Sequence, residues 1–172
     1  KMEDLRTHGI TKNPLRFKES SYGLWYYEQQ VLGFNYRLTD IQAALGISQI
    51  KRLDKFIKKR NLIRKTYIKK LKHLPLSPLE IPKEIISACH LFIIKLENND
   101  SEFHKKIFNS LRKANIGVQL HYIPIHLQPY FKNLGFKKGD FPNAEAYSRN
   151  AISLPIYTKL SSKNQKRVIK TL

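Results

Sequence analysis

The segment from residue 33 to 44 combines groups that bind anions with the start of a helix. It reads Gly-Phe-Asn-Tyr-Arg-Leu-Thr-Asp-Ile-Gln-Ala-Ala, and its opening glycine allows a tight approach of backbone. Thr39 is a preferred N-cap, and Gln42, three positions later, can return a hydrogen bond to the cap's own N–H. Because a helix N-terminus favours negative charge, Asn35 and Arg37 directly before it predict a phosphate or carboxylate site. The residues alone also allow an ordinary capped helix preceded by two solvated polar side chains.

A second polar and aromatic group, His-Tyr-Ile-Pro-Ile-His-Leu-Gln-Pro-Tyr, occupies residues 121–130. Two histidines at this spacing could ligate zinc. No second cysteine or nearby carboxylate completes a four-ligand set, however, so the pattern argues against a metal. A loop that leaves a strand and faces a substrate fits the pattern better, since loops on a rigid scaffold carry binding groups. The alternative is that His121 and His126 are packed structural residues.

These segments need a long helix and a small sheet to position them. Apolar residues recur at three- and four-residue steps from Thr39 to His73, which predicts one helix of about thirty residues, roughly 50 Å long, with a basic opposite face. A nearly continuous apolar run in residues 91–94 predicts a strand over 88–96 that is covered on both faces. Further expected elements are a helix over 102–113 capped by Ser101, a strand over 118–122, a helix opened by Pro142, a strand over 151–155, and a last helix with Ser162 and Gln165 as capping box. This order predicts a compact α+β unit.

The composition narrows the class of protein. The chain has 172 residues, a formal net charge of +19 and one cysteine, Cys89. A single cysteine excludes an internal disulfide and favours a reducing, cytoplasmic setting. No apolar run approaches the ~20 residues that span a bilayer. The charge suits nucleic acid, an anionic membrane face or phosphorylated small molecules. The basic residues are mostly Lys and spread over several segments, which argues against nucleic acid, and a Lys-biased composition without any partner gives the same numbers.

Two further motifs carry a family resemblance. With Phe-Pro-Asn-Ala-Glu at 141–145 and Ile-Ser-Leu-Pro-Ile-Tyr at 152–157 beside the two segments above, the chain resembles the DegT-type nucleotide-sugar aminotransferases over almost its whole length. Residues 26–30 and the 121–130 segment are most similar to the members of pseudaminic acid synthesis, which aminate the C4 ketone of a UDP-4-keto-6-deoxy-N-acetyl-hexosamine. The resemblance implies pyridoxal 5'-phosphate as cofactor, glutamate as amino donor and a homodimer with a cross-subunit active site.

The resemblance also implies how the chain is divided. It resembles the C-terminal α+β small domain of a fold-type-I aminotransferase, preceded by a loop and a connecting helix from the large domain. Residues 1–38 would be the tail of the large domain with an active-site and dimer loop, residues 39–74 the connecting helix, and residues 75–172 the small domain. The lysine that holds the cofactor is expected upstream of this chain. No catalytic residue is therefore assigned within it, and the fragment alone is expected to be inactive.

Site roles follow from the same resemblance. Asn35 aligns with a residue that reaches the cofactor phosphate of the partner subunit, and Tyr36 and Arg37 would lie at the same active-site edge. The loop bordering the nucleotide-sugar pocket would contribute His121, His126 and Tyr130. A different class of function, a non-catalytic basic binding module for nucleic acid or a partner subunit, is the alternative to this hypothesis.

Overall fold

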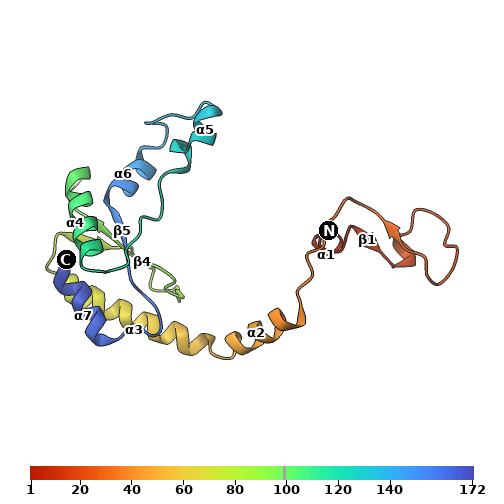
Figure 1. Cartoon of the computed structure of the whole chain (residues 1–172), viewed down its shortest axis with the longest axis horizontal. Coiled ribbons are helices and arrows are strands. Elements are labelled where there is room, and N and C mark those ends of the chain that lie inside the picture. Colours follow the sequence, from red (N-terminus) through yellow and green to blue (C-terminus); the bar gives the residue numbers. More distant parts are fainter. Residues whose placement is uncertain (99) are drawn as a thin grey trace. The chain divides into compact units, whose positions relative to one another are not determined.

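The computed structural model describes residues 1–98 and 100–172 and forms two compact units, Lys1–Lys51 and Arg52–Leu172 (Figure 1). The first unit contains α1 (Met2–Arg6), β1 (Ile10–Thr11), a 3-10 turn (Pro14–Arg16), β2 (Glu28–Gln29) and α2 (Asp40–Ile50). β1 and β2 pair antiparallel, with Ile10 opposite Gln29. This small ribbon ties the start of the chain to the segment that leads into α2.

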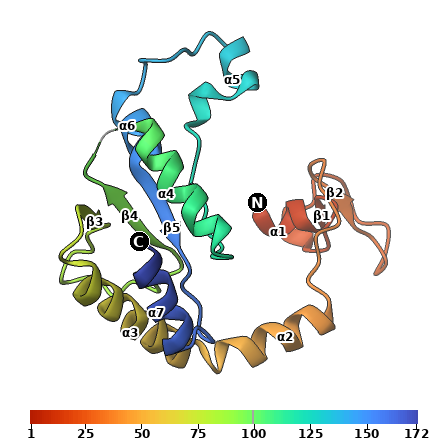
Figure 2. The ribbon, with the colours of Figure 1, turned by 60° about the vertical axis from the view of Figure 1, so that its left-hand side comes forward.

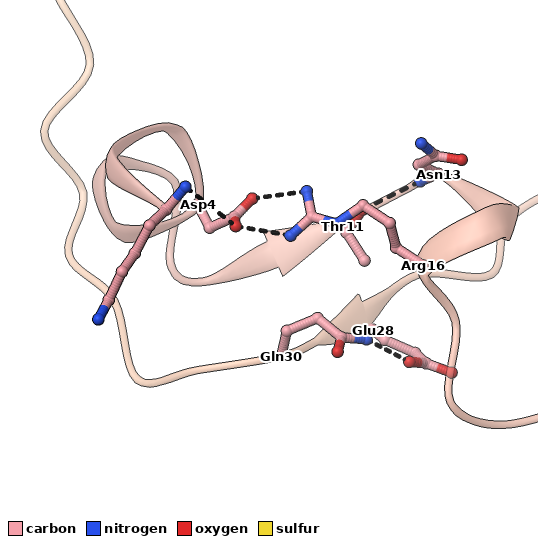
Figure 3. A network of polar contacts seen from close by, with 7 residues as sticks. Asp4, Thr11, Asn13, Arg16, Glu28 and Gln30 are labelled. Carbon is pink, nitrogen blue, oxygen red and sulfur yellow. Dashed lines mark hydrogen bonds and ion pairs between the residues drawn. The ribbon is translucent and has the colours of Figure 1, made fainter.

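Two carboxylates hold the loops of the first unit (Figure 3). Asp4 accepts two hydrogen bonds from the Arg16 guanidinium, at 3.0 and 2.6 Å, and these keep the pKa of Asp4 below its usual range. Glu28 accepts hydrogen bonds from Lys18 N and Glu19 N, both at 2.8 Å, from the Tyr26 hydroxyl and from the Gln30 amide. Partial burial raises the pKa of Glu28, but the hydrogen bonds outweigh it and the net pKa is lowered. The ionised Glu28 side chain therefore holds the loop before β2 through hydrogen bonds to its backbone and side chains.

The second unit is a three-stranded antiparallel sheet, in the order β3-β4-β5, with helices packed around it. Its elements are α3 (Leu53–Leu71), β3 (Leu76–Pro78), β4 (Phe92–Leu96), α4 (Ser101–Lys113), a 3-10 turn (Ile125–Leu127), α5 (Pro129–Asn133), α6 (Pro142–Asn150), β5 (Ala151–Leu154) and α7 (Ser162–Thr171). α7 lies alongside α3 in both views, whereas α5 lies away from the sheet (Figures 1 and 2). The predicted α+β fold is confirmed.

The hydrophobic core lies between the sheet and three helices. α3 supplies Ile63, Tyr67 and Leu71, while α4 and α7 supply Leu111 and Val168. The Tyr67 ring stacks on Phe92 of β4, with centroids 4.8 Å apart, and its hydroxyl donates to the Pro155 carbonyl at 3.0 Å. Burial raises the pKa of the Tyr67 phenol far above its usual range. The sheet is thus fixed to α3 by apolar contact and by one long-range hydrogen bond.

The single helix expected from Thr39 to His73 is wrong in one respect, because it is two helices. α2 ends at Ile50 and α3 begins at Leu53, and Arg52 between them has φ −107° and ψ 0°, which depart from the typical α-helical angles. No residue of α2 is buried, whereas α3 inserts its apolar side into the core. Ile41, Leu45 and Ile50 are 84%, 60% and 71% exposed. α3 packs in the core, whereas α2 buries no residue. Regular spacing of apolar residues therefore does not require one continuous helix.

The strand predictions are corrected at two places. β4 begins at Phe92 rather than at residue 88. Phe92, Ile94 and Leu96 on one face are buried, whereas Ile93 on the other face is half-buried and Lys95 is exposed, so the second face is only partly covered. The strand expected over residues 118–122 is reduced to one bridge, Gln119 opposite Ser153. Gln119 pairs with β5 on the side that β4 leaves free, and the pairing does not continue past this residue. β5 itself is buried on both faces.

Two predicted helix caps are shifted by one residue. Asp100, not Ser101, caps α4 by accepting from Glu102 N at 2.9 Å. Ser161, not Ser162, caps α7 by accepting from Asn164 N at 3.2 Å. In both places two neighbouring residues are of types that can cap a helix, and the first of the two makes the capping hydrogen bond. Gln165, expected to complete a capping box, instead donates to the Ile63 carbonyl of α3 at 2.8 Å.

Candidate functional site

Residues 33–36 lie in extended form against the end of α1. Phe34 N donates to the carbonyl of residue 5 at 2.6 Å, and the Phe34 carbonyl accepts from His8 N at 2.8 Å. Tyr36 N donates to the carbonyl of residue 6 at 2.8 Å. The Phe34 and Tyr36 rings stack, with centroids 5.1 Å apart. The backbone on both sides of Asn35 is therefore fixed before α2 begins.

Gly33 makes this close contact possible. A Cβ atom at Gly33 would lie 2.3 Å from Gly9 N, 2.6 Å from the His8 carbonyl carbon and 2.9 Å from the Leu5 oxygen. Each of these neighbours is backbone and cannot rotate away. The tight approach expected at this glycine is confirmed.

The N-terminus of α2 has the predicted capping box. Thr39 Oγ1 accepts from Gln42 N at 3.3 Å, and Thr39 N donates to Gln42 Oε1 at 3.0 Å. Between this cap and the α1 contact, Asn35, Tyr36 and Arg37 are exposed. The Asn35 amide, on a backbone held at both sides, and the exposed Arg37 guanidinium are suitable donors for the oxygens of a phosphate or carboxylate.

The second unit holds the other predicted group, and its best-defined contact is buried. His126 Nε2 lies 2.9 Å from Glu145 Oε1, and both side chains are only 7% exposed. Gly139 N donates to the same oxygen at 2.7 Å. The hydrogen bond from His126, followed by that from Gly139, lowers the pKa of Glu145. The structure places His126 in a buried pair, and that pair connects three segments of the chain.

The other two predicted residues of this group lie in different surroundings. His121 Nδ1 is 2.7 Å from the Ser153 hydroxyl of β5, so the start of the loop is attached to the sheet. Tyr130, on α5, is 69% exposed and packs edge-on against Phe131 with centroids 5.3 Å apart. The three residues therefore do not converge on one point.

A cavity of about 510 Å³ lies under this loop. His126 lines it, together with aromatic and aliphatic side chains from the 121–130 loop, from α5, from the segment between α5 and α6, and from α6. The lining residues are Tyr122, Ile123, Pro124, Ile125, Phe131, Phe136, Phe141, Ala144 and Tyr147. The His126 and Phe141 ring centroids are 4.9 Å apart. Such a cavity suits the apolar or flat part of a small ligand, with His126 as its polar group.

Sequence reasoning missed Glu145 and the aromatic lining as parts of this site. The signal was present in the Phe-Pro-Asn-Ala-Glu motif at 141–145, but a glutamate in the first turn of a helix looks like an ordinary helix-dipole partner. Only the fold brings it to His126, 19 positions away. Among the described residues no group of three or more metal-ligating side chains gathers. None of their helices combines the length and apolarity that crossing a membrane requires.

Comparison with known proteins decides the family. The model of the DegT/DnrJ/EryC1/StrS aminotransferase family matches residues 1–172. The chain belongs to this family. The resemblance to this aminotransferase family is thereby confirmed, and the α+β fold matches that of solved aminotransferase structures.

Individual DegT/DnrJ/EryC1/StrS relatives match the chain at intermediate identity. An uncharacterised protein of Methanocaldococcus jannaschii is 40% identical over 164 residues, 94% of the chain and 42% of that protein. The UDP-4-amino-4,6-dideoxy-N-acetyl-beta-L-altrosamine transaminase of Campylobacter jejuni is 34% identical over 173 residues, 100% of the chain and 43% of that protein. The PMP form of a protein of Streptococcus pneumoniae described as a sugar aminotransferase superposes with a TM-score of 0.88 at 33% identity, covering 98% of the chain and 42% of that structure. The chain thus spans about two-fifths of the length of these relatives.

Proposed function

We propose that the chain forms part of a pyridoxal-phosphate-dependent aminotransferase that moves an amino group from glutamate to the C4 ketone of a UDP-4-keto-6-deoxy-N-acetyl-hexosamine, as in pseudaminic acid synthesis. The observation that carries the proposal is the anchored segment before α2, which holds Asn35 and Arg37 at a capped helix start. Family membership along the whole chain and the similarity to the C. jejuni transaminase support the reaction and the substrate.

The proposal divides the work between this chain and other segments. The chain spans about two-fifths of its relatives, so the lysine that holds the cofactor is assigned to a segment outside residues 1–172. We propose that residues 1–38 belong to the large domain, and that a homodimer completes the active site by bringing Asn35 to the cofactor phosphate of the partner subunit. On this proposal residues 1–172 alone do not transfer amino groups, and the working enzyme is cytoplasmic.

The donor set before α2 fits a phosphate group. The Asn35 amide and the Arg37 guanidinium are exposed, and both donate hydrogen bonds to anionic oxygens. Pyridoxal phosphate, when bound, supplies the electron sink that lets an amino group pass between donor and ketone. The contribution of this chain is to orient: Asn35 holds the phosphate, Arg37 and Tyr36 border the sugar, and the fixed backbone limits the entropy lost on binding.

The 121–130 loop is proposed to border the nucleotide sugar. His121 fixes the start of the loop to Ser153, and His126 offers a polar atom in an otherwise apolar cavity. Tyr130 lies exposed on α5, where its hydroxyl can meet a ligand or a neighbouring subunit. The side chain of His126 is itself buried, and a hydrogen bond made in a region of low dielectric is stronger than one made in water.

The test uses the full polypeptide expressed from its gene, with cofactor affinity and amino transfer measured separately. Replacing Asn35 or Arg37 by Ala should weaken cofactor or substrate binding by about 10- to 100-fold, the effect of losing one hydrogen bond to a charged group. Lys18→Ala is the matched control, because it removes one exposed positive charge in the same unit. An equal loss in the control would refute the role of the segment. Failure of the wild type to aminate any UDP-4-keto-6-deoxy sugar would refute the reaction.

A further inference from the structure

One carboxylate oxygen joins three segments around the cavity. Glu145 Oε1 accepts from His126 Nε2 at 2.9 Å and from Gly139 N at 2.7 Å. His126 belongs to the 3-10 turn at 125–127, Gly139 to the loop between α5 and α6, and Glu145 to α6. Gly139 has φ +96°, a backbone conformation that favours glycine. A glycine at this position therefore allows the turn in which its N–H donates to Glu145. The arrangement is a built contact at the wall of the cavity.

The hydrogen bond between Glu145 and His126 determines which imidazole nitrogen carries a proton. An ionised carboxylate only accepts hydrogen bonds, so the His126 nitrogen that faces it must carry the proton. The lowered pKa of Glu145, caused first by the His126 hydrogen bond, keeps that carboxyl ionised near neutral pH. In a neutral imidazole the proton on Nε2 leaves Nδ1 as an acceptor. Phe141, with its ring centroid 4.9 Å from that of His126, limits rotation of the ring.

We infer that Glu145 is a positioning residue for substrate binding: it holds His126 in the Nε2–H tautomer at the cavity wall and leaves Nδ1 as the hydrogen-bond acceptor for the nucleotide sugar. The inference rests on the proposed function, which assigns the substrate to this loop. Glu145 acts through His126, in the way that outer carboxylates orient ligating histidines at metal sites.

The experiment compares two variants with a control in the full polypeptide. Glu145→Ala removes the acceptor, and Glu145→Gln keeps an acceptor oxygen but removes the charge. Asp140→Asn is the control, since Asp140 Oδ2 accepts from Lys137 N at 2.8 Å in the same loop and makes no hydrogen bond to His126 among the described residues. Steady-state kinetics give KM and kcat for the nucleotide sugar. Nitrogen-15 NMR of labelled histidine gives the tautomer of His126 without any substrate.

The expected result is a split between binding and turnover. Glu145→Ala should raise KM for the nucleotide sugar about tenfold or more while kcat changes by a few-fold at most, because one substrate hydrogen bond loses its fixed partner. Its His126 should show a mixture of tautomers, whereas the wild type and Asp140→Asn show the Nε2–H form. Glu145→Gln should lie between the wild type and Glu145→Ala in both readouts, and it carries the test should the alanine variant not fold.

Two results would overturn the inference. One is an unchanged tautomer and KM in the Glu145 variants. The other is a rise in KM that Asp140→Asn reproduces, which would show a general effect of loosening the loop. A wild type that aminates no nucleotide sugar refutes the proposed function instead, and the tautomer measurement still decides whether Glu145 fixes His126.

Discussion

Adding one methyl group at Gly33 should detach the segment that carries Asn35. The new Cβ atom would lie 2.3 Å from Gly9 N and 2.6 Å from the His8 carbonyl carbon, both backbone atoms. Residues 33–36 must therefore move away from α1. That movement breaks or lengthens the hydrogen bonds of Phe34 N, His8 N and Tyr36 N, which measure 2.6, 2.8 and 2.8 Å.

The magnitude follows from these contacts. A net value of about 1 kcal/mol for each of the three hydrogen bonds gives about 3 kcal/mol if all are lost. Overpacking that the structure absorbs by shifting costs about 1–3 kcal/mol. The free energy of opening this segment should thus fall by about 2–3 kcal/mol, which raises amide exchange by roughly 30- to 150-fold.

Native-state hydrogen exchange at the amides of residues 8, 34 and 36 measures this directly. Gly46→Ala in α2 is the matched control, because a Cβ atom there meets no atom within 4 Å. Alanine is about 1 kcal/mol better than glycine inside a helix, so the control should slow exchange in α2 about fivefold. Glycine-to-alanine substitution is thus expected to speed amide exchange at Gly33 and to slow it at Gly46, within the same unit. Unchanged exchange at residues 8, 34 and 36 in Gly33→Ala would refute the reasoning.

Three further predictions concern the second unit. Tyr67→Phe removes the hydroxyl that donates to the Pro155 carbonyl and should lower the free energy of unfolding by about 1–2 kcal/mol in urea, while the ring stacking remains. Ile94→Ala, at a fully buried site, should cost about 2–5 kcal/mol, whereas Ile86→Ala, at a side chain 88% exposed, should change the same quantity by less than about 0.5 kcal/mol. The pKa of Glu145 is lowered in the fold, so its contribution to stability is complete above the ordinary carboxyl range, about pH 4.3, and is lost as the pH falls through the folded-state pKa. Melting temperatures from about pH 5 to pH 3 should therefore fall more steeply for the wild type than for Glu145→Gln, and parallel curves would show that this carboxyl is not responsible.

Features fixed by neighbours in sequence were predictable. The capping box of Thr39 and Gln42 needs only two side chains three positions apart, and it forms as expected. The proline that opens α6 acts in the same local way. The helices α3, α4 and α7 followed because each buries one side at helical spacing.

Features decided by distant packing were not predictable. Nothing in Lys51 and Arg52 marks a helix break, since both are good helix formers, and the break lies at the boundary between the two compact units. The partner of His126 is Glu145, which only the loop between α5 and α6 brings into contact. The roles of Asn35, Tyr36 and Arg37 stay predictions, because their side chains are exposed and no side-chain contact within the described residues fixes what they bind.

The uncovered apolar side of α2 has a practical consequence for handling residues 1–172 as an isolated polypeptide. The net charge of +19 makes copies repel one another, and at an ionic strength of 0.01 M this repulsion extends over about 30 Å. Raising the salt to about 1 M shortens that range to about 3 Å. Ile41, Leu45 and Ile50 of different copies can then meet. The polypeptide should accordingly stay dispersed in buffer of low ionic strength and precipitate at high salt. Ammonium sulfate is therefore suitable for concentrating the polypeptide but not for storing it in solution.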